Sequence, residues 1–437
     1  MRIAIVGSGI SGLGAAWLLA QGHDVRVFEA DGRIGGHSNT VAVQAPEGPR
    51  LIDTGFIVYN TQCYPNLIAL FDHLGVPTAK SSMTFAVSLD QGRYEYSGSG
   101  AHGLFGQPSN LFNLDHWRMT RDIWRFFREA DALRTDATAE TISLGAWLAE
   151  RKYSRAFVDL HILPMAAAIW SAPTSELMAF PAAAFARFFA NHGLLQVRNR
   201  PEWRTVCGGS RAYVQRICAT LGNPVATGHR VVAVRRQNAG ASLTFASGSN
   251  ETFDHAVLAC HADQALGLLA DATADERRIL SPFKYAKNVA VLHTDACWMP
   301  CRRRLWSSWN YIGAGDGLCL TYWMNKLQPL ATTENYFITL NAAGEIAPEK
   351  TLQTFAYEHP LFNAAAMAAQ KQLWALQGVR NTWFAGGYFG YGFHEDGLQA
   401  GLAVAEALGS IKRPWTVADS QSRIHVGTEP PVLEAAE

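Results

Sequence analysis

The feature that most constrains the fold is the run RIAIVGSGISGLGAAWLLAQGHDVRVFEA at residues 2–30. Residues 2–6 form a short apolar run rich in β-branched side chains, which predicts a buried strand. Glycines in the pattern G-x-G-x-x-G then open a stretch that predicts a helix from about Ser11 to Gln21, and residues 25–28 predict a second strand. This order of strand, glycine-rich turn, helix and strand indicates a βαβ unit with two parallel strands.

Each glycine of this turn has a physical reason to lack a side chain. Gly7 permits the tight turn, Gly9 lets a pyrophosphate approach the backbone, and Gly12 lets helix and strand pack closely. The helix N-terminus offers free N–H groups and a partial positive charge to phosphates. Glu29 follows at roughly the 20-residue spacing of an acid that binds a ribose diol. A turn without a ligand is the alternative, but the strand, the helix and the acid together favour a dinucleotide.

A second glycine pair, Gly35 and Gly36, follows with Arg33 beside it, and its extra backbone N–H groups suit a longer diphosphate ligand than NAD. The segment FEADGRIGGHSNT (28–40) resembles the dinucleotide-binding motif of the FAD family that includes flavin amine oxidases, protoporphyrinogen oxidase and phytoene desaturases. The segment LIDTGFIVYN (51–60) continues the resemblance, because family members carry Asp-x-Gly near the isoalloxazine. The resemblance implies FAD as cofactor and an FAD-dependent oxidoreductase.

Two later segments extend the resemblance. WRTVCGGSRAYVQRICATL (203–221) resembles the family's Gly-Gly-Ser turn and following helix, and the strand HRVVAVRR includes Val231, where the family's backbone touches adenine. NTWFAGGYFGYGFHEDGLQAGLAVAEAL (381–408) resembles the last strand, an aromatic glycine-rich loop and the last helix. In the family that helix points its N-terminus at the flavin, where a helix dipole stabilises negative charge by about 0.3–2 kcal/mol.

The site residues implied by the resemblance fall in these segments. The cofactor-binding candidates are Gly7, Gly9, Ile10, Ser11, Gly12, Glu29, Ala30, Arg33, Gly35, Gly36, His37, Asp53, Thr54, Gly55, Phe56, Val231, Gly387, Tyr388, Asp396, Gly397 and Leu398. The catalytic candidates are His394, Glu395 and Tyr391. Asp396 has an alternative role as a plain helix cap, and Glu395 has one as a charge at the positive helix end. The aromatic residues of the loop are expected to pack around the flavin, with an amine-binding cage as the other possibility.

The predicted fold is α/β, with a Rossmann-type, glutathione-reductase-like FAD-binding domain and a discontinuous α+β substrate domain. Residues 101–200 read as mostly helical, 283–345 as strands and 350–374 as helical. The predicted segments are 1–75, 203–270 and 376–410 for the FAD-binding domain, 76–202 and 271–375 for the substrate domain, and 411–437 for a polar C-terminal tail.

The sequence does not decide the substrate class. Amine oxidases of the family often place a Lys on a strand so that its water bridges to flavin N5, but in SPFKYAKNVAVLHTD (281–295) the residue before Val289 is Asn288, with Lys284 and Lys287 nearby. We therefore expect two-electron oxidation of an apolar small molecule, with desaturation of a lipid acyl or isoprenoid chain first. A flavin amine oxidase making imine and hydrogen peroxide and a redox-sensing flavoprotein without turnover are the alternatives. The sequence does not identify the electron acceptor.

Residues 110–134 carry a second clue to lipids. Arg118, Arg121, Arg125 and Arg128 lie on one face of the predicted helix, and apolar residues lie on another. This pattern fits either an interfacial helix at a membrane surface or a core helix with a solvated Arg face.

Composition excludes other classes. Lys plus Arg and Asp plus Glu both number 37, so no global charge favours nucleic acid. The seven cysteines show no CxxC and no apolar run reaches 18 residues, which predicts a cytoplasmic protein, with peripheral contact on the inner face of the membrane as an option. No His spacing suggests a metal site, and the second glycine pair disfavours an enzyme that uses NAD alone.

Overall fold

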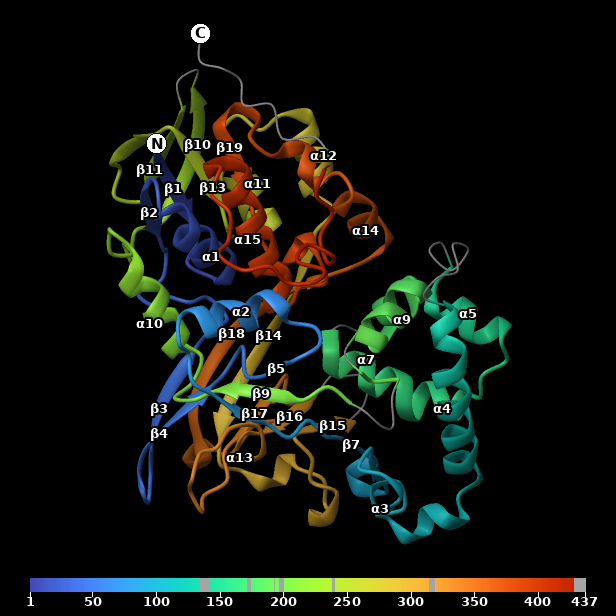
Figure 1. Cartoon of the computed structure of the whole chain (residues 1–437). Coiled ribbons are helices and arrows are strands. Elements are labelled where there is room, and N and C mark those ends of the chain that lie inside the picture. Colours follow the sequence, from blue (N-terminus) through green and yellow to red (C-terminus); the bar gives the residue numbers. More distant parts are fainter. Residues whose placement is uncertain are drawn as a thin grey trace.

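The computed structural model describes residues 1–133, 142–170, 174–191, 193–195, 200–237, 240–313 and 319–427. Three parts can be followed in Figure 1: an α/β half at the top, a large sheet below it, and a layer of helices at the right. Within the described residues, no helix is both long and apolar enough to cross a bilayer.

The upper part is built on a parallel sheet in the order β19 (Thr382–Phe384), β13 (His255–Leu258), β1 (Arg2–Val6) and β2 (Asp24–Phe28). The helices α1 (Ile10–Leu19) and α15 (His394–Gly409) pack against each other beside it (Figure 1). A second, antiparallel sheet contains β10 (Val231–Gln237), β11 (Gly240–Phe245) and β12 (Asn250–Phe253). This arrangement confirms the predicted βαβ unit and Rossmann-type fold.

The lower part is a seven-stranded sheet. Its order is β18 (Thr351–Leu361), β14 (Lys284–His293), β17 (Phe337–Leu340), β16 (Leu320–Trp323), β15 (Trp309–Gly313), β7 (Phe85–Leu89) and β8 (Tyr94–Ser97). The strands predicted between 283 and 345 are confirmed, but the helix predicted over 350–374 is wrong for most of its length. Residues 351–361 pair antiparallel with β14 from end to end, so that the partner strand satisfies their backbone groups.

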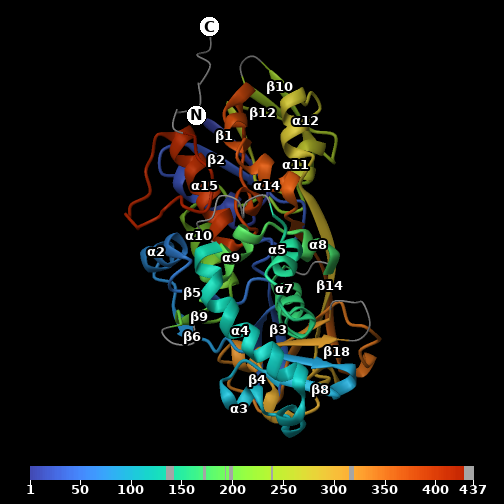
Figure 2. The ribbon, with the colours of Figure 1, turned by 90° about the vertical axis from the view of Figure 1, so that its right-hand side faces the viewer.

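The helical part comes from residues 101–191, as predicted, and faces the viewer in the centre and lower half of Figure 2. Its core is aromatic, with Phe126, Phe157, Phe185 and Phe189 all buried. The helices are α3 (Ala101–Leu104), α4 (Leu114–Leu133), α5 (Leu144–Glu150), α6 (Arg155–Phe157), α7 (Leu163–Trp170), α8 (Thr174–Ala179) and α9 (Ala182–Asn191).

Further strands and α-helices complete the described fold. They are β3 (Thr40–Ala45), β4 (Gly48–Asp53), β5 (Tyr59–Asn60), α2 (Pro65–His73), β6 (Thr78–Lys80), β9 (Trp203–Val206), α10 (Arg211–Thr220), α11 (Ala262–Leu268), α12 (Ala274–Leu280), α13 (Met324–Leu327) and α14 (Ala364–Gln370).

The predicted tail is packed over its described part, residues 411–427. Trp415 stacks on Trp17 of α1 with ring centroids 5.3 Å apart, and the Nε of Arg423 donates to the Asp396 carboxylate at 2.5 Å. The arginines that make this segment look polar in the sequence are buried against acids rather than solvated. The rest of the predicted tail, 428–437, lies outside the described residues.

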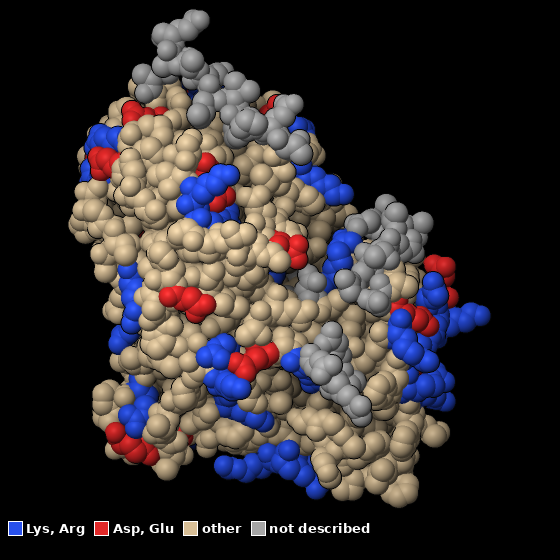
Figure 3. Space-filling model, in the orientation of Figure 1, with Lys and Arg blue, Asp and Glu red and all other residues tan. Residues whose placement is uncertain are grey.

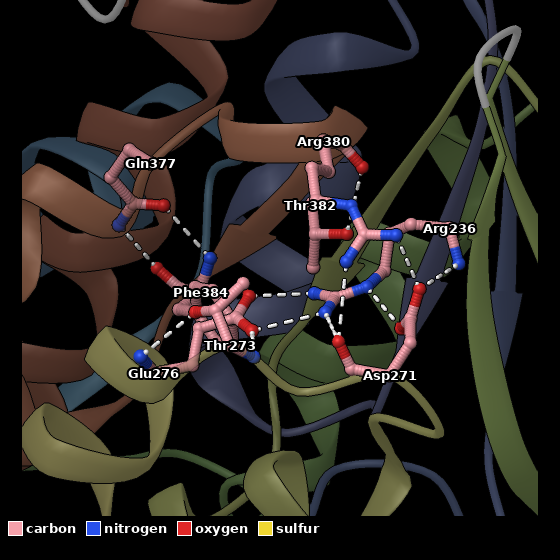
Figure 4. Close-up of polar contacts among 8 residues, drawn as sticks. All are labelled: Arg236, Asp271, Thr273, Glu276, Gln377, Arg380, Thr382 and Phe384. Atoms are coloured by element: carbon pink, nitrogen blue, oxygen red, sulfur yellow. Dashed lines mark hydrogen bonds and ion pairs between the residues drawn. The ribbon is translucent and has the colours of Figure 1, made fainter.

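A buried ion network ties the two sheets of the upper part together (Figure 4). Arg236 on β10 has a fully buried side chain that donates to Asp271 at 2.6 Å and to both oxygens of Glu276 at 2.6 and 3.0 Å. Arg380, just before β19, donates to the same Asp271 at 2.6 Å. Glu276 also completes a capping box with Thr273 at the start of α12. The network thus joins β10, α12 and the approach to β19.

We predict that Arg236→Met lowers the free energy of unfolding by about 3–5 kcal/mol, because it leaves Glu276 buried without its cation. The control is Arg278→Met, which removes an exposed pair with Asp275 and costs at most about 1 kcal/mol. Urea unfolding of the purified proteins measures both. Equal losses in the two variants would contradict a special role for the buried network.

Candidate flavin site

The first glycine loop leaves room for a ligand at one position. A Cβ at Gly7, where φ is +106°, would lie 2.7 Å from the carbonyl oxygen of Ala259, and a Cβ at Gly12 would collide with the Gly7 carbonyl. A Cβ at Gly9 would instead meet no atom within 4 Å. Gly9 is the N-cap of α1, and no side chain caps the first turn, so its N–H groups have no side-chain acceptor from the cap residue. The loop therefore fits a diphosphate.

Glu29 is held at the edge of this loop. Its carboxylate accepts hydrogen bonds from the backbone N–H of Ser8 at 3.0 Å, the Ser8 hydroxyl at 2.5 Å and the backbone N–H of Asp31 at 3.0 Å. The Glu29 carbonyl accepts from the N–H of His229, two residues before Val231 at the start of β10. The candidate ribose and adenine contacts thus lie on neighbouring pieces of chain, with Ala30 exposed beside them.

The second glycine pair lies directly on the first loop. A Cβ at Gly36, where φ is +56°, would be 3.1 Å from the Cα of Gly9, and the N–H of Gly35 donates to the Ser8 hydroxyl at 3.2 Å. Arg33 is half-buried, and its guanidinium lies 3.5 Å from the Ser38 carbonyl. The two glycine segments, predicted separately, form one continuous backbone surface.

Residues 53–56 continue this surface through backbone pairing. The N–H of Phe56 donates to the His37 carbonyl at 2.7 Å and that of Thr54 to Asn39 at 2.8 Å, and a Cβ at Gly55 would collide with the same His37 carbonyl. The buried Asp53 faces the other way. Its carboxylate accepts hydrogen bonds from three residues. These are Thr40, Ser210 and Gln328. Burial raises the pKa of Asp53 to about 6. This geometry favours a structural role for the Asp53 side chain, which fixes the Gly-Gly-Ser turn.

The N-termini of α1 and α15 meet. A Cβ at Gly397 would lie 2.7 Å from the Ser11 hydroxyl and 3.0 Å from Ile10, and Leu398 packs where Gly14 lacks a side chain. Asp396 is fully buried and accepts from the backbone N–H groups of Tyr391 and Phe393, which makes it a helix cap. Its pKa is raised by burial, although the guanidinium of Arg423 opposes this shift. Two helix dipoles therefore point at the same place.

The three catalytic candidates separate in the structure. The Glu395 carboxylate lies at the N-terminus of α2, where it accepts hydrogen bonds from Asn66, Leu67 and Gln399, so it holds the fold together rather than offering a free acid or base. Tyr391 packs among the residues of the helical layer. Asp396 thus has the geometry of the helix cap named as its alternative, whereas the Glu395 carboxylate binds the start of α2 rather than the N-terminus of its own helix.

His394 is enclosed at the junction. Its ring stacks on Phe56 with centroids 3.7 Å apart, and its Nε2 lies 2.8 Å from the Tyr213 hydroxyl and 3.0 Å from that of Ser38. Desolvation lowers the pKa of His394 to about 3, so the imidazole is neutral at pH 7.

Gly387 lies against the backbone of Gly392 in the loop before α15. The Tyr388 ring is buried, and its hydroxyl has no hydrogen-bond partner among the described residues.

Sequence reasoning missed a group of imidazoles beside His37. The His37 ring lies 5.2 Å from Tyr357 and 5.5 Å from His359, both on β18. Nδ1 of His359 is 3.1 Å from the amide nitrogen of Asn288 on β14, and desolvation lowers the pKa of His359 to about 4. The alternation of Tyr357 and His359 along a strand was the available signal, but a helix was predicted there.

The lysines near Asn288 do not reach this group. Asn288 is buried, whereas Lys287 is exposed because neighbouring strand residues point to opposite faces. Lys284, on the same face as Asn288, is exposed at the first residue of β14. Among the described residues of β14, an amide rather than an amine faces the imidazoles.

The family model for flavin-containing amine oxidoreductases matches residues 10–317. The chain belongs to this family. A Mycobacterium tuberculosis protein assigned as the flavin-containing monoamine oxidase AofH is 28% identical over 262 residues, which cover 57% of this chain and 54% of that protein. The chain thus spans about half the length of this curated relative.

Two solved structures share the whole fold of this amine oxidoreductase family member. A fatty acid isomerase from P. acnes has a TM-score of 0.68 at 15% identity, covering 94% of this chain and 98% of that one. Putrescine oxidase bound to putrescine has a TM-score of 0.68 at 16% identity, covering 94% and 99%. At this identity the likeness shows the fold alone. Family membership makes FAD the cofactor, and the predicted individual contacts stay a proposal.

We predict that Gly9→Val abolishes retention of FAD while the protein still folds. The backbone of Gly9 is extended, with φ −67° and ψ 178°, and its Cβ would enter open space, so valine is accommodated by the protein and excludes only the diphosphate. The flavin-to-protein absorbance ratio and the circular dichroism spectrum measure the two effects. Gly267→Val is the matched control, because a Cβ there also meets nothing within 4 Å. A yellow Gly9→Val protein would place the diphosphate elsewhere.

We predict that His394 makes the fold sensitive to acid. The pKa of His394 is about 3 in the folded protein against 6.5 in the unfolded chain. Below pH 6.5 the unfolded chain therefore binds a proton that the folded protein does not bind. Folding free energy is then lost as pH falls, by up to about 2 kcal/mol at pH 5 from this group. Chemical unfolding of wild type and His394→Asn at pH 7 and pH 5 tests this: the variant should lose less between the two. The exposed His102→Asn should behave as wild type.

Proposed function

We propose that this protein is an FAD-dependent oxidoreductase that removes two electrons from an apolar substrate, by desaturating a lipid acyl or isoprenoid chain. The observation that carries the proposal is the packing of the loop before α15. Phe393 stacks on Phe188 of α9 with centroids 5.0 Å apart, and Tyr391 packs into the same apolar cluster as Phe362. The side of the helix N-terminus that faces the helical layer is therefore aromatic and aliphatic, which suits a hydrocarbon.

The chain's own groups have definite parts in such a reaction. Bound FAD supplies the capacity to accept two electrons with a hydride. The first glycine loop and the Gly35–Gly36 pair hold the diphosphate, and the N-termini of α1 and α15 stabilise negative charge on the cofactor. Desaturation also releases a proton from the neighbouring carbon. Burial lowers the pKa of both His37 and His359, so these neutral imidazoles are weak bases, and the Glu395 carboxylate is committed to α2. The proton is therefore expected to leave to solvent.

Amine oxidation is the second candidate, and the family match favours it. Two observations weigh against it. The buried position on β14 carries Asn288 where amine oxidases often carry a Lys, and the two acids at the start of α15 are both engaged in structural hydrogen bonds. The fold does not distinguish desaturation from amine oxidation, because solved structures of the same fold include a fatty acid isomerase and a putrescine oxidase.

Anaerobic bleaching of the bound flavin tests the proposal, with acyl lipids, isoprenoids and amines as substrates. We expect a phospholipid with saturated stearoyl chains or an isoprenoid to reduce the flavin and lose two hydrogens, read by mass spectrometry. Octadecylamine, which has the same chain and an amine head, should not yield the aldehyde that hydrolysis of an imine would release. Bleaching by octadecylamine and short amines, with none from acyl chains or isoprenoids, would overturn the proposal in favour of an amine oxidase. Bleaching by none of them would favour a redox-sensing flavoprotein.

A further inference from the structure

Exposed apolar side chains are concentrated at one corner of the molecule. Of the ten large hydrophobic residues that are exposed in the described chain, five lie between residues 111 and 124. Trp124, at 54%, lies further along α4. The other four are Phe112 at 89%, Leu114 at 71%, Leu111 at 49% and Trp117 at 47%. They occupy the 3₁₀ helix Pro108–Phe112 and the first turn of α4, at the lower right of Figure 1. We propose that this corner, called the apolar corner below, docks on the surface of a membrane that contains anionic phospholipids.

The apolar corner is held with its apolar side outward. The amide of Gln107, which is buried, accepts from the N–H of Glu95 at 2.7 Å and donates to the Arg93 carbonyl at 2.7 Å. The amide of Asn110, also buried, donates to the Glu95 carbonyl at 2.9 Å. Polar side chains thus point into the protein while their neighbours Leu111 and Phe112 point into solvent. Because this is the reverse of normal burial, an apolar medium outside the protein is the expected partner.

The Trp117 side chain is fixed in place within the corner. The indole N–H of Trp117 donates to the Leu111 carbonyl at 3.0 Å, and its ring lies 5.0 Å from Phe105. Asn113 fixes the start of α4 by accepting from the N–H of Asp115 at 2.9 Å. The corner is therefore an ordered platform rather than a frayed end, so docking needs little ordering of the chain.

The charge that complements an anionic surface does not come from α4. Its arginines are largely neutralised by acids on the same helix, since Arg118 pairs with Asp115 at 2.8 Å and Arg125 with Glu129 at 2.7 Å. The basic face predicted for residues 110–134 is thus balanced over these turns. Cations that attract an anionic membrane must therefore lie on the segments that flank the apolar corner.

Three other cations flank the corner. Arg93 is tied to it through Gln107, and the segment of Arg303 and Arg304 is tied to it through Leu305, which fills the space where Gly106 lacks a Cβ. All three are exposed, and none forms an ion pair with a described carboxylate. Figure 3 shows Lys and Arg side chains gathered along the lower edge of the molecule. Apolar side chains beside unpaired cations match a lipid interface whose head groups are anionic.

A second copy of the chain is a weaker partner for the same surface. In a twofold dimer the same patch would meet itself, so the Arg93, Arg303 and Arg304 groups of two copies would approach one another. A membrane places acidic head groups there instead. The inference does not depend on the proposed desaturation, because a peripheral enzyme can act on a soluble substrate.

Vesicle flotation of the FAD-bound protein tests the proposal. We expect binding to phosphatidylcholine vesicles that contain phosphatidylglycerol, weaker binding to pure phosphatidylcholine, and loss of the difference at high salt. Phe112→Ser with Leu114→Ser should lower partitioning to both vesicles by about tenfold or more. Leu352→Ser with Val379→Ser is the matched control, since both positions are exposed elsewhere, and it should bind as wild type.

The cation flank is tested separately by Arg93→Glu with Arg304→Glu, which should remove the preference for anionic vesicles and leave binding to pure phosphatidylcholine unchanged. Flavin content and unfolding midpoint check that each variant is folded. Failure of the wild type to float with either vesicle at low salt overturns the proposal. A concentration-dependent dimer that Phe112→Ser with Leu114→Ser dissociates, without vesicle binding, identifies a second copy as the occupant instead. These outcomes are independent of the flavin-bleaching assay, so failure of one leaves the other intact.

Discussion

The close approach of two helix N-termini is the constraint on which the site depends. Residues 10–19 and 394–409 are nearly 400 positions apart, yet Gly397 lies on Ser11, and a Cβ at Gly401 would collide with the Ser11 carbonyl. Side chains at these glycines would separate the helices and divide the positive ends of their dipoles between two places. Held together, they bring the positive ends of two helix dipoles to one place, which is what the proposed site for an anionic cofactor requires.

The acids of the second helix keep this arrangement in place. Asp396 closes its own loop and binds Arg423, while Glu395 reaches the first turn of α2. Each carboxylate is buried, so each must be matched by donors, and those donors come from three separate parts of the chain. The same residues that looked available for proton transfer are therefore the ones that join α15, α2 and the segment after residue 411. Among the described imidazoles of this site, His37 has no such duty, since its Nε2 has no hydrogen-bond partner, whereas His359 is hydrogen-bonded to Asn288.

What could be predicted from the sequence was local. The glycine pattern, the acid at its spacing and the aromatic loop before α15 each act through neighbouring backbone, and all were found at their predicted positions. Strand β18 was missed because its stability comes from β14, some 65 residues earlier, rather than from its own periodicity. Because β18 was missed, His359, whose ring lies beside that of His37, was missed as well. The buried pairing of Arg423 was missed for a related reason: a charged residue reads as solvated until its partner is placed.

The same limit applies to the region of α4, where the sequence left an interfacial helix and a core helix with a solvated Arg face both open. The arginines that suggested a basic helix are paired within their own turns, a pattern visible in the spacing of Asp115 and Glu129. The inverted burial just before it, with Gln107 and Asn110 inside and Phe112 outside, depends on the strand that carries Glu95 and cannot be read from composition. A sequence can show that polar and apolar residues alternate in a short loop. Which set faces inward is decided by the donors and acceptors of the remote strand that the loop meets, and here that strand turns the apolar set toward the surroundings.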